Sequence, residues 1–115
     1  KMRATYYVLL IAALSSYAAS NQVVQLNDKL DTVAGNSVTF ECSLKDGSMG
    51  SYYMFWYRQR PKNSLEWIYK EGGKYGDRFG DRFVGTVDGS NNKCTLEINA
   101  AELGDAAVYY CAASP

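Results

Sequence analysis

The sequence predicts a single all-β domain, and three observations support this. Aromatic residues make up 14% of the 115 residues, and aromatic side chains favour pleated strands. There are ten glycines and only two prolines, which suits short strands joined by tight turns. Short segments that alternate apolar and polar residues recur between turn-forming residues. Together these features predict a sandwich or barrel of short strands.

Residues 38–44 give a clear strand signal because apolar and polar residues alternate. The alternation places Val38, Phe40, Cys42 and Leu44 on one face, which we expect to be buried. The next segment, residues 46–51, is rich in turn-forming residues and has no apolar period. We therefore expect it to be an exposed loop.

Residues 53–59 and 65–69 are the next strong strand signals. The segment between them, residues 60–64, contains Pro61 and polar residues and predicts a turn. A short tip follows at residues 71–73, where Gly72 and Gly73 stand together. Strand, turn and strand in this order predict a β-hairpin.

The last third of the chain contains a short repeat and two further strands. The tetrapeptide Gly-Asp-Arg-Phe occurs at residues 76–79 and again at 80–83, which is too little for a repeat fold. Cys94, Leu96 and Ile98 share one face of a predicted strand. A polar bend at residues 102–105 then precedes a strand at 107–111.

The first twenty residues have the pattern of a secretory signal peptide. Lys1 and Arg3 precede an apolar run at residues 6–14 that is too short to be a stable membrane anchor. Small residues precede Asn21 in the spacing that a signal peptidase accepts. We therefore expect residues 1–20 to be removed and residues 21–115 to form the domain. The alternative for this run is a buried core helix.

Composition disfavours several classes of function. Twelve Lys and Arg residues balance twelve Asp and Glu residues, so no basic field attracts nucleic acid. The absence of histidine removes Ser/His/Asp triads and most catalytic zinc sites. Asp77 and Asp81 are the carboxylates that could be imagined as an acid and base pair. They fall in the repeat, and we expect both to lie on a solvated edge and not in a catalytic site. We expect no enzyme activity, no cofactor and no metal site.

Several motifs occur in one order along the chain. They are Cys42, Trp56 and Cys111, with Trp-Tyr-Arg-Gln at 56–59, Leu-Glu-Trp at 65–67, Arg-Phe at 82–83 and Asp-Ala-Ala-Val-Tyr-Tyr-Cys at 105–111. Over residues 22–115 the sequence resembles the immunoglobulin variable domain. The resemblance implies a variable-type β-sandwich with Greek-key connections, in which two antiparallel sheets are joined by one disulfide.

The resemblance also implies structural roles for individual residues. Cys42 and Cys111 would form the intersheet disulfide against Trp56, and Tyr109 would be the tyrosine corner, whose hydroxyl bonds to backbone a few residues upstream. Leu96 belongs to the same core.

A charged pair and an unpaired cysteine complete this set. The resemblance implies an ion pair between Arg82 and Asp105, with Arg78 as the competing partner because of the repeat. Cys94 is left over, and we expect it to be a small buried apolar residue. An intermolecular bridge, or a misassembled disulfide with Cys42 or Cys111, is the alternative.

Variable domains use two surfaces, and the resemblance assigns residues to both. The first is a sheet face that packs against a second variable domain to form a heterodimer, here Tyr57, Gln59, Leu65, Trp67 and Tyr110. The second consists of three antigen-binding loops, here Asp46, Ser48, Ser51, Tyr52, Tyr53, Glu71, Gly72, Gly73, Ala112, Ala113 and Ser114. The alternatives are an ordinary solvated sheet for the first and simple turn chemistry for the second.

Within the family, three features are most similar to T-cell receptor alpha or delta variable segments. They are Trp-Tyr-Arg-Gln at 56–59, a very short second loop and the Cys-Ala-Ala-Ser ending. No Phe-Gly-x-Gly strand follows Ala112, so the sequence resembles an unrearranged gene segment that lacks the last, J-encoded strand. The expected partners are a second variable domain and an antigen, most simply a peptide-MHC complex.

Other readings remain open within the same fold. Leu-Glu-Trp at 65–67 is more like an antibody heavy chain, and a variable-type innate receptor and a homophilic adhesion domain are further alternatives. We expect the chain to enter the secretory pathway and to act at the extracellular face of the plasma membrane in a receptor complex. Any membrane attachment would come from constant or transmembrane regions that this sequence does not contain.

Overall fold

The computed structural model describes the backbone of residues 5–12, 23–25, 29–33, 35–44 and 47–115, and the side chains of residues 35–44 and 47–115. The described residues form strands and three short 3-10 turns: η1 Met49–Ser51, η2 Gly89–Asn91 and η3 Leu103–Asp105. The all-β prediction is therefore confirmed. No helix in the described part of the chain has the length and apolar character needed to cross a membrane.

The described strands follow the chain in numerical order. They are β1 Thr5–Ala12, β2 Val23–Gln25, β3 Lys29–Val33, β4 Val38–Leu44, β5 Tyr53–Gln59, β6 Leu65–Lys70, β7 Lys74–Tyr75, β8 Phe83–Asp88, β9 Lys93–Ile98 and β10 Val108–Ser114.

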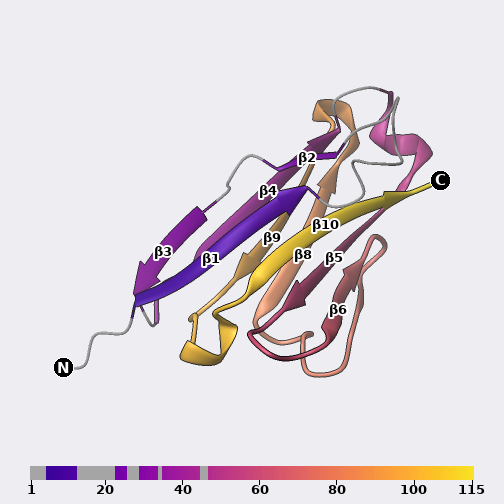
Figure 1. Ribbon diagram of the computed structural model, residues 1–115. Helices are drawn as coiled ribbons and strands as arrows, with labels where there is room; N and C mark the ends of the chain where they lie inside the picture. Colours follow the sequence, from indigo (N-terminus) through magenta and orange to yellow (C-terminus); the bar gives the residue numbers. More distant parts are fainter. Residues whose placement is uncertain (1–4, 13–22, 26–28, 34, 45–46) are drawn as a thin grey trace.

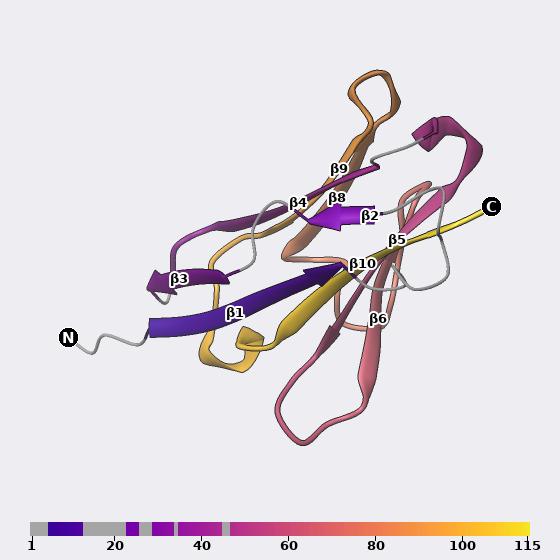
Figure 2. The same cartoon turned by 45° about the horizontal axis from the view of Figure 1, so that its top comes forward.

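The strands make two sheets that pack face to face (Figures 1 and 2). The six-stranded sheet has the order β3-β1-β10-β5-β6-β7, and the four-stranded sheet has the order β2-β4-β9-β8. The strand pairs of the described residues are antiparallel, except that β1 runs parallel to β10. Two sheets stacked in this way are a β-sandwich.

Strand β1 lies within the segment that we expect to be a signal peptide. In the uncleaved sequence Thr5–Ala12 pairs with both β3 and β10 (Figure 1), and removal of residues 1–20 stays a prediction. The backbone of β1 pairs with β10, whose edge would otherwise leave unpaired backbone N–H and C=O groups. The expected cleavage point before Asn21 lies within residues 13–22, which are outside the described residues. Cleavage there would remove β1 and open the edge of β10.

The core lies between the sheets and is set by alternation along each strand. In β4 the predicted face is buried, since Val38, Phe40, Cys42 and Leu44 are each less than a tenth exposed. On the neighbouring strand β9 of the same sheet, Leu96 is fully buried on this face, and strands β5 and β10 of the other sheet contribute the fully buried Trp56 and Tyr109 opposite it. The rings of Phe40 and Tyr109 stack with their centroids 4.6 Å apart.

One disulfide joins the two sheets. Cys42 in β4 is bonded to Cys111 in β10, as predicted, and Trp56 is the cross-strand partner of Cys111. The bridge closes a separation of 69 residues. In the chain-entropy model such a loop removes roughly 4 kcal/mol of conformational freedom from the unfolded chain.

The loop after β4 is less exposed than the sequence predicts. We expected residues 46–51 to form an exposed loop, but Met49 is fully buried and joins the core cluster. In the 3-10 turn η1, Gly50 is exposed and the side chain of Met49 points into the core. A long apolar side chain pointing inward from a turn stabilises the domain by removing apolar surface from water.

The edge of the four-stranded sheet is closed by two tyrosines. The backbone N–H of Gly85 in β8 donates to the hydroxyl of Tyr75, with 3.0 Å between nitrogen and oxygen. A Cβ atom at Gly85 would lie 2.6 Å from the ring of Tyr69, so only glycine fits there. Tyr69 and Tyr75 pack on each other across β6 and β7. This edge therefore has less free backbone for pairing with another chain.

The position of Cys94 generates the first testable prediction. Cys94 is a free thiol, is buried, and lies opposite Cys42 in the β4–β9 register. Burial raises the pKa of the Cys94 thiol to about 12, so the nucleophilic thiolate is scarce at neutral pH. An alkylating reagent should label Cys94 in the unfolded chain and leave it almost unlabelled in the native chain. Peptide mapping without reduction should recover the Cys42–Cys111 bridge, and a main bridge containing Cys94 would contradict the assignment.

Candidate functional site

The outer face of the six-stranded sheet brings together the five residues expected to pair with a second domain. Tyr57 on β5 is the cross-strand partner of Trp67 on β6 and of Tyr110 on β10. Gln59 is opposite Leu65 in the same register. The five positions therefore form one continuous surface, on the opposite side of the sheet from the disulfide.

This surface is apolar and accessible. Leu65 is 54% exposed and Trp67 is 38% exposed, and Tyr57 and Tyr110 are half-buried beside them. The side chain of Gln59 donates to the carbonyl of Asn63, which fixes the turn between β5 and β6. Contiguous apolar side chains on an open sheet are typical of protein contact surfaces and less typical of a solvated sheet.

A β-bulge in β6 sets the orientation of Trp67. The cross-strand pairs Trp56–Tyr69 and Tyr57–Trp67 leave Ile68 as an extra residue between them. Ile68 and Tyr69 are consequently both buried, where strict alternation would bury only one of them. The bulge allows Leu65 and Trp67 to face outward while the end of β6 still contributes to the core.

The first candidate antigen-binding loop is well ordered around η1. Ser48 caps this turn, because its hydroxyl accepts from the N–H of Gly50 at 3.3 Å. Ser51 is exposed, Tyr52 is half-buried, and Tyr53 is exposed at the start of β5. Asp46, the remaining residue expected in this loop, lies outside the described residues.

The second candidate loop is the tight turn between β6 and β7. Gly72 and Gly73 have φ values of 102° and 77°, which L side chains rarely adopt. The Glu71 carboxylate accepts from the N–H of Met54, and the Glu71 N–H donates to the Met54 carbonyl at 2.8 Å. The turn is therefore tied to β5, next to the end of the first loop.

The third candidate loop does not begin where we expected. Ala112, Ala113 and Ser114 continue strand β10, where they pair with Phe55, Met54 and Tyr53 of β5. The small side chains of this segment fit between the paired strands. Pairing with β5 therefore continues to Ser114, three residues beyond the predicted end of the strand at Cys111. A loop does not start at Ala112, because these three residues belong to β10, and their expected role in antigen binding stays a prediction.

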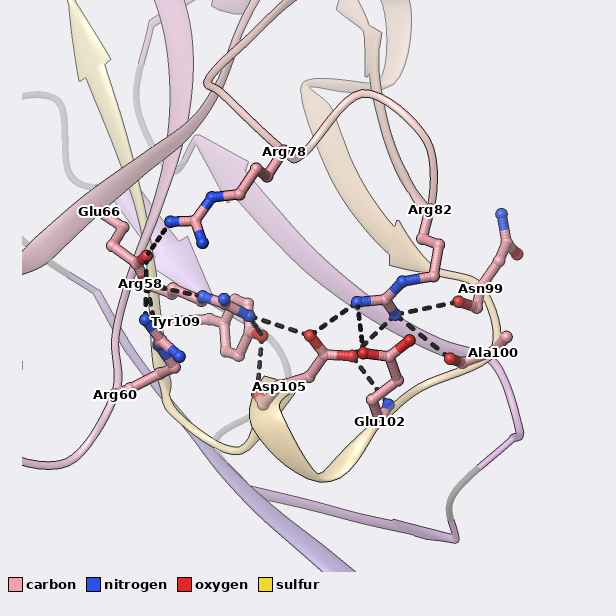
Figure 3. A network of polar contacts seen from close by, with 10 residues as sticks. All are labelled: Arg58, Arg60, Glu66, Arg78, Arg82, Asn99, Ala100, Glu102, Asp105 and Tyr109. Atoms are coloured by element: carbon pink, nitrogen blue, oxygen red, sulfur yellow. Dashed lines mark hydrogen bonds and ion pairs between the residues drawn. The ribbon is translucent and has the colours of Figure 1, made fainter.

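The end of the sandwich near η3 carries a dense network of charged groups (Figure 3). Asp105 is at its centre and is almost fully buried. Its carboxylate accepts two hydrogen bonds from Arg82, at 2.8 and 3.1 Å, and one from the backbone N–H of Glu102 at 2.9 Å. Arg82 therefore holds Asp105 in the bidentate manner that the sequence analysis expected.

Arg58 is a second partner of Asp105 that the sequence analysis did not identify. Its side chain is only 9% exposed, and its Nη1 lies 3.0 Å from Asp105 Oδ1 and 3.2 Å from the Tyr109 hydroxyl. Tyr109 in turn donates to the backbone carbonyl of Asp105 at 2.7 Å. The guanidinium also lies over the rings of Phe79 and Phe83. Alternation along β5, through Met54, Trp56 and Arg58, was the signal that could have located it.

The Glu66 carboxylate forms ion pairs with Arg58, Arg60 and Arg78. Its Oε1 lies 2.9 Å from Arg58 Nε and 3.1 Å from Arg60 Nε. Arg78 is 81% exposed and reaches Glu66 only at 3.9 Å, so it is not the partner of Asp105. The two copies of the tetrapeptide repeat are alike in their phenylalanines, since Phe79 and Phe83 pack edge to face in the core. They differ in their arginines, because Arg82 binds Asp105 at 2.8 Å and Arg78 has only the 3.9 Å contact with Glu66.

Asp105 and Glu66 are held in their charged forms. Burial raises the pKa of Asp105, but hydrogen bonds from Arg82, Glu102 and Arg58 outweigh it and leave the pKa below its ordinary value. Burial likewise raises the pKa of Glu66. The hydrogen bonds and positive charges of Arg58 and Arg60 outweigh this effect, so the pKa of Glu66 lies below its ordinary value. A general acid at neutral pH needs a raised pKa, so these groups suit charge pairing better than proton transfer.

The lowered pKa of Asp105 predicts how stability depends on pH. The unfolded chain binds the proton first as the pH falls, so the stabilisation is complete above about pH 4 and is lost as the pH falls through the lower, folded pKa. Asp105→Asn should lower stability at neutral pH and make the decline below about pH 4 shallower. Urea midpoints measured across this pH range test the slope. Asp77→Asn, at an exposed position, controls for loss of one charge, and an unchanged slope in Asp105→Asn would contradict the prediction.

The network also predicts a ranking of three arginine substitutions. Arg58→Ala leaves Asp105 and Glu66 short of a buried partner and should destabilise the domain most, by about 3 to 5 kcal/mol. Arg82→Ala should cost about 3 kcal/mol or less, and Arg78→Ala under about 1 kcal/mol, since Arg78 is exposed. Denaturant midpoints give the order directly. Equal shifts for Arg82→Ala and Arg78→Ala would overturn the assignment of Asp105 to Arg82.

Comparison with known protein families agrees with the sandwich and the intersheet bridge. The family model described as the immunoglobulin V-set domain matches residues 25–115. Domains of this set are variable-type recognition modules, generally without enzyme activity, and are typically extracellular or secreted. The match spans most of the sequence and includes both cysteines of the bridge. The chain therefore belongs to the immunoglobulin V-set family.

Proposed function

We propose that the chain is the antigen-recognition variable domain of an adaptive immune receptor of the T-cell receptor alpha or delta type. In this proposal the domain pairs with a second variable domain through its six-stranded sheet. It binds antigen, most simply a peptide-MHC complex, through the loops at one end of the sandwich. The domain performs no catalysis and holds no cofactor.

The observation that carries the proposal is the apolar face of β5, β6 and β10. Trp67 and Leu65 lie exposed on β6, and Tyr57 and Tyr110 continue the same face across β5 and β10. Tryptophan and tyrosine are enriched among the residues that dominate binding energy at protein interfaces. A solitary domain gains nothing from leaving these side chains in water, whereas a paired domain buries them.

The loops support antigen binding by composition and by position. Ser48, Ser51, Tyr52 and Tyr53 offer adaptable hydrogen-bonding groups and large contact area at low entropic cost. The turn at residues 71–73 is tied to Met54, close to where the first loop ends. Two loops held at one end of a rigid sandwich provide a surface on which a third loop would complete the site.

The receptor type rests on sequence resemblance. Trp-Tyr-Arg-Gln at 56–59, the short turn at 71–73 and Cys-Ala-Ala-Ser at 111–114 favour the alpha or delta type. Residues 1–20 are proposed to be a secretory signal peptide, with residues 21–115 as the exported domain. The domain would then act at the outer face of the plasma membrane within a receptor complex.

The pairing proposal predicts the effect of changing the face. Trp67→Ser and Leu65→Arg should reduce self-association of the chain and raise the Kd for a T-cell receptor beta variable domain by about tenfold or more. Stability should change by less than about 1 kcal/mol, because both side chains are exposed. Sedimentation velocity and binding titrations measure association, and denaturant midpoints measure stability.

Val84→Ser is the matched control for these substitutions. Val84 is 38% exposed, as Trp67 is, but it lies on β8 of the other sheet. It should leave association with a second variable domain unchanged. If Trp67→Ser unfolds the domain, the face is core and pairing fails as an explanation. If the domain remains monomeric and binds no receptor variable domain, the heavy-chain, innate-receptor and adhesion alternatives gain support.

A further inference from the structure

A residue from a different part of the chain contacts the first candidate antigen-binding loop. Asn92 ends the turn η2 between β8 and β9, with φ 54° and ψ 43°. Asparagine tolerates this left-handed conformation better than most residues with a side chain. The conformation leads directly into β9, and the Asn92 side chain contacts the segment that follows β4.

Two hydrogen bonds join the Asn92 side chain to that loop. The N–H of Met49 donates to Asn92 Oδ1 at 3.0 Å, and Asn92 Nδ2 donates to the carbonyl of Gly47 at 2.9 Å. The side-chain amide thus satisfies one backbone donor and one backbone acceptor two residues apart. The backbone carbonyl of Asn92 also accepts from the N–H of Leu44 at 3.2 Å, at the end of β4.

These contacts act together with the local structure of the loop. Met49 is fully buried, so its side chain and its N–H fix the same residue from two directions. The N–H groups of Ser51 and Tyr52 donate back to the carbonyls of Ser48 and Met49, at 2.9 and 3.1 Å. The exposed groups of Ser48 and Ser51 are consequently carried on a turn whose base is held by Asn92.

We propose that Asn92 is a positioning residue that fixes the conformation of the loop at residues 47–52, and through it the surface that this loop offers to antigen. The inference rests on the proposed function for its consequence, since a loop that bound nothing would not need a fixed surface. A loop already ordered before binding loses less conformational freedom when it binds. Asn92 need not touch antigen to affect recognition.

Asn92→Gly is the direct test in the full chain. Glycine accepts the left-handed backbone and retains the bond from Leu44 to the residue 92 carbonyl, but it loses both side-chain bonds. Native-state hydrogen exchange should then show the amides of Met49, Ser51 and Tyr52 exchanging at least about tenfold faster. The amides of Trp56 and Leu96, in β5 and β9, should keep their protection.

Asn91→Gly is the matched control, since Asn91 lies in the same turn and its side chain bonds to Asp88 and not to the loop. It should leave the exchange of residues 47–52 unchanged. Asn92→Asp is the second variant, because it keeps the acceptor for Met49 and loses the donor to Gly47. The Met49 amide should then be better protected than in Asn92→Gly.

The outcomes separate this inference from the proposed function. Equal exchange of the loop in Asn92→Gly and Asn91→Gly would overturn the positioning role, and so would a loss of protection spread evenly over β5 and β9. Neither result depends on antigen, so neither bears on pairing or recognition. Selective loosening of the loop in a chain that binds no antigen or receptor domain would support the positioning role and count against the proposed function.

Discussion

The packing of two sheets across one disulfide is the constraint on which the rest of the molecule depends. The bridge from Cys42 to Cys111 fixes one point between β4 and β10, and Trp56 lies beside it on the adjacent strand. Once these residues face inward, alternation decides the direction of every other side chain on their strands. Tyr57 and Tyr110 face outward for the same reason. The outward positions of β5 and β10 are thus a geometric consequence of the core.

The charged network lies at one end of this apolar core. Burying its charged groups costs desolvation free energy, which interactions within the network must offset. Asp105 and Arg58 are both nearly buried, and an isolated buried charge would be strongly destabilising. Each is therefore shared: Asp105 receives two guanidinium groups and a backbone N–H, and Arg58 reaches Asp105, Glu66 and Tyr109. Such fully connected groups specify one arrangement of β5, β6, η3 and β10, because any shift leaves a charge unpaired.

Much of the fold could be predicted from the sequence because strand alternation depends only on residues two positions apart. The buried face of β4, the hairpin of β5 and β6, and the strands at 93–98 and 108–111 all follow from this rule. Arg58 continues the inward series of β5, so the same rule contained its position, although a charged residue in a core is unexpected. The bridge itself was predicted through the family resemblance of the cysteine and tryptophan positions.

The features that could not be predicted depend on contacts between distant segments. The bond from Met49 to Asn92 joins residues 43 positions apart, and no local pattern reports it. The inward turn of Met49 follows from that contact and from the space available in the core. Similarly, the bulge at Ile68 and the extension of β10 to Ser114 are decided by the partner strand β5.

The molecule closes one sheet edge and leaves one sheet face open, and this contrast is the strongest physical argument for a binding role. At β8, Tyr75 covers a backbone N–H and Tyr69 fills the space beside Gly85, so that edge is protected against pairing with other chains. On the six-stranded sheet, Trp67 and Leu65 are held outward by a bulge, while the described inner residues of β5, β6 and β10 pack into the core. Both side chains are exposed, and the proposed pairing would remove their apolar surface from water.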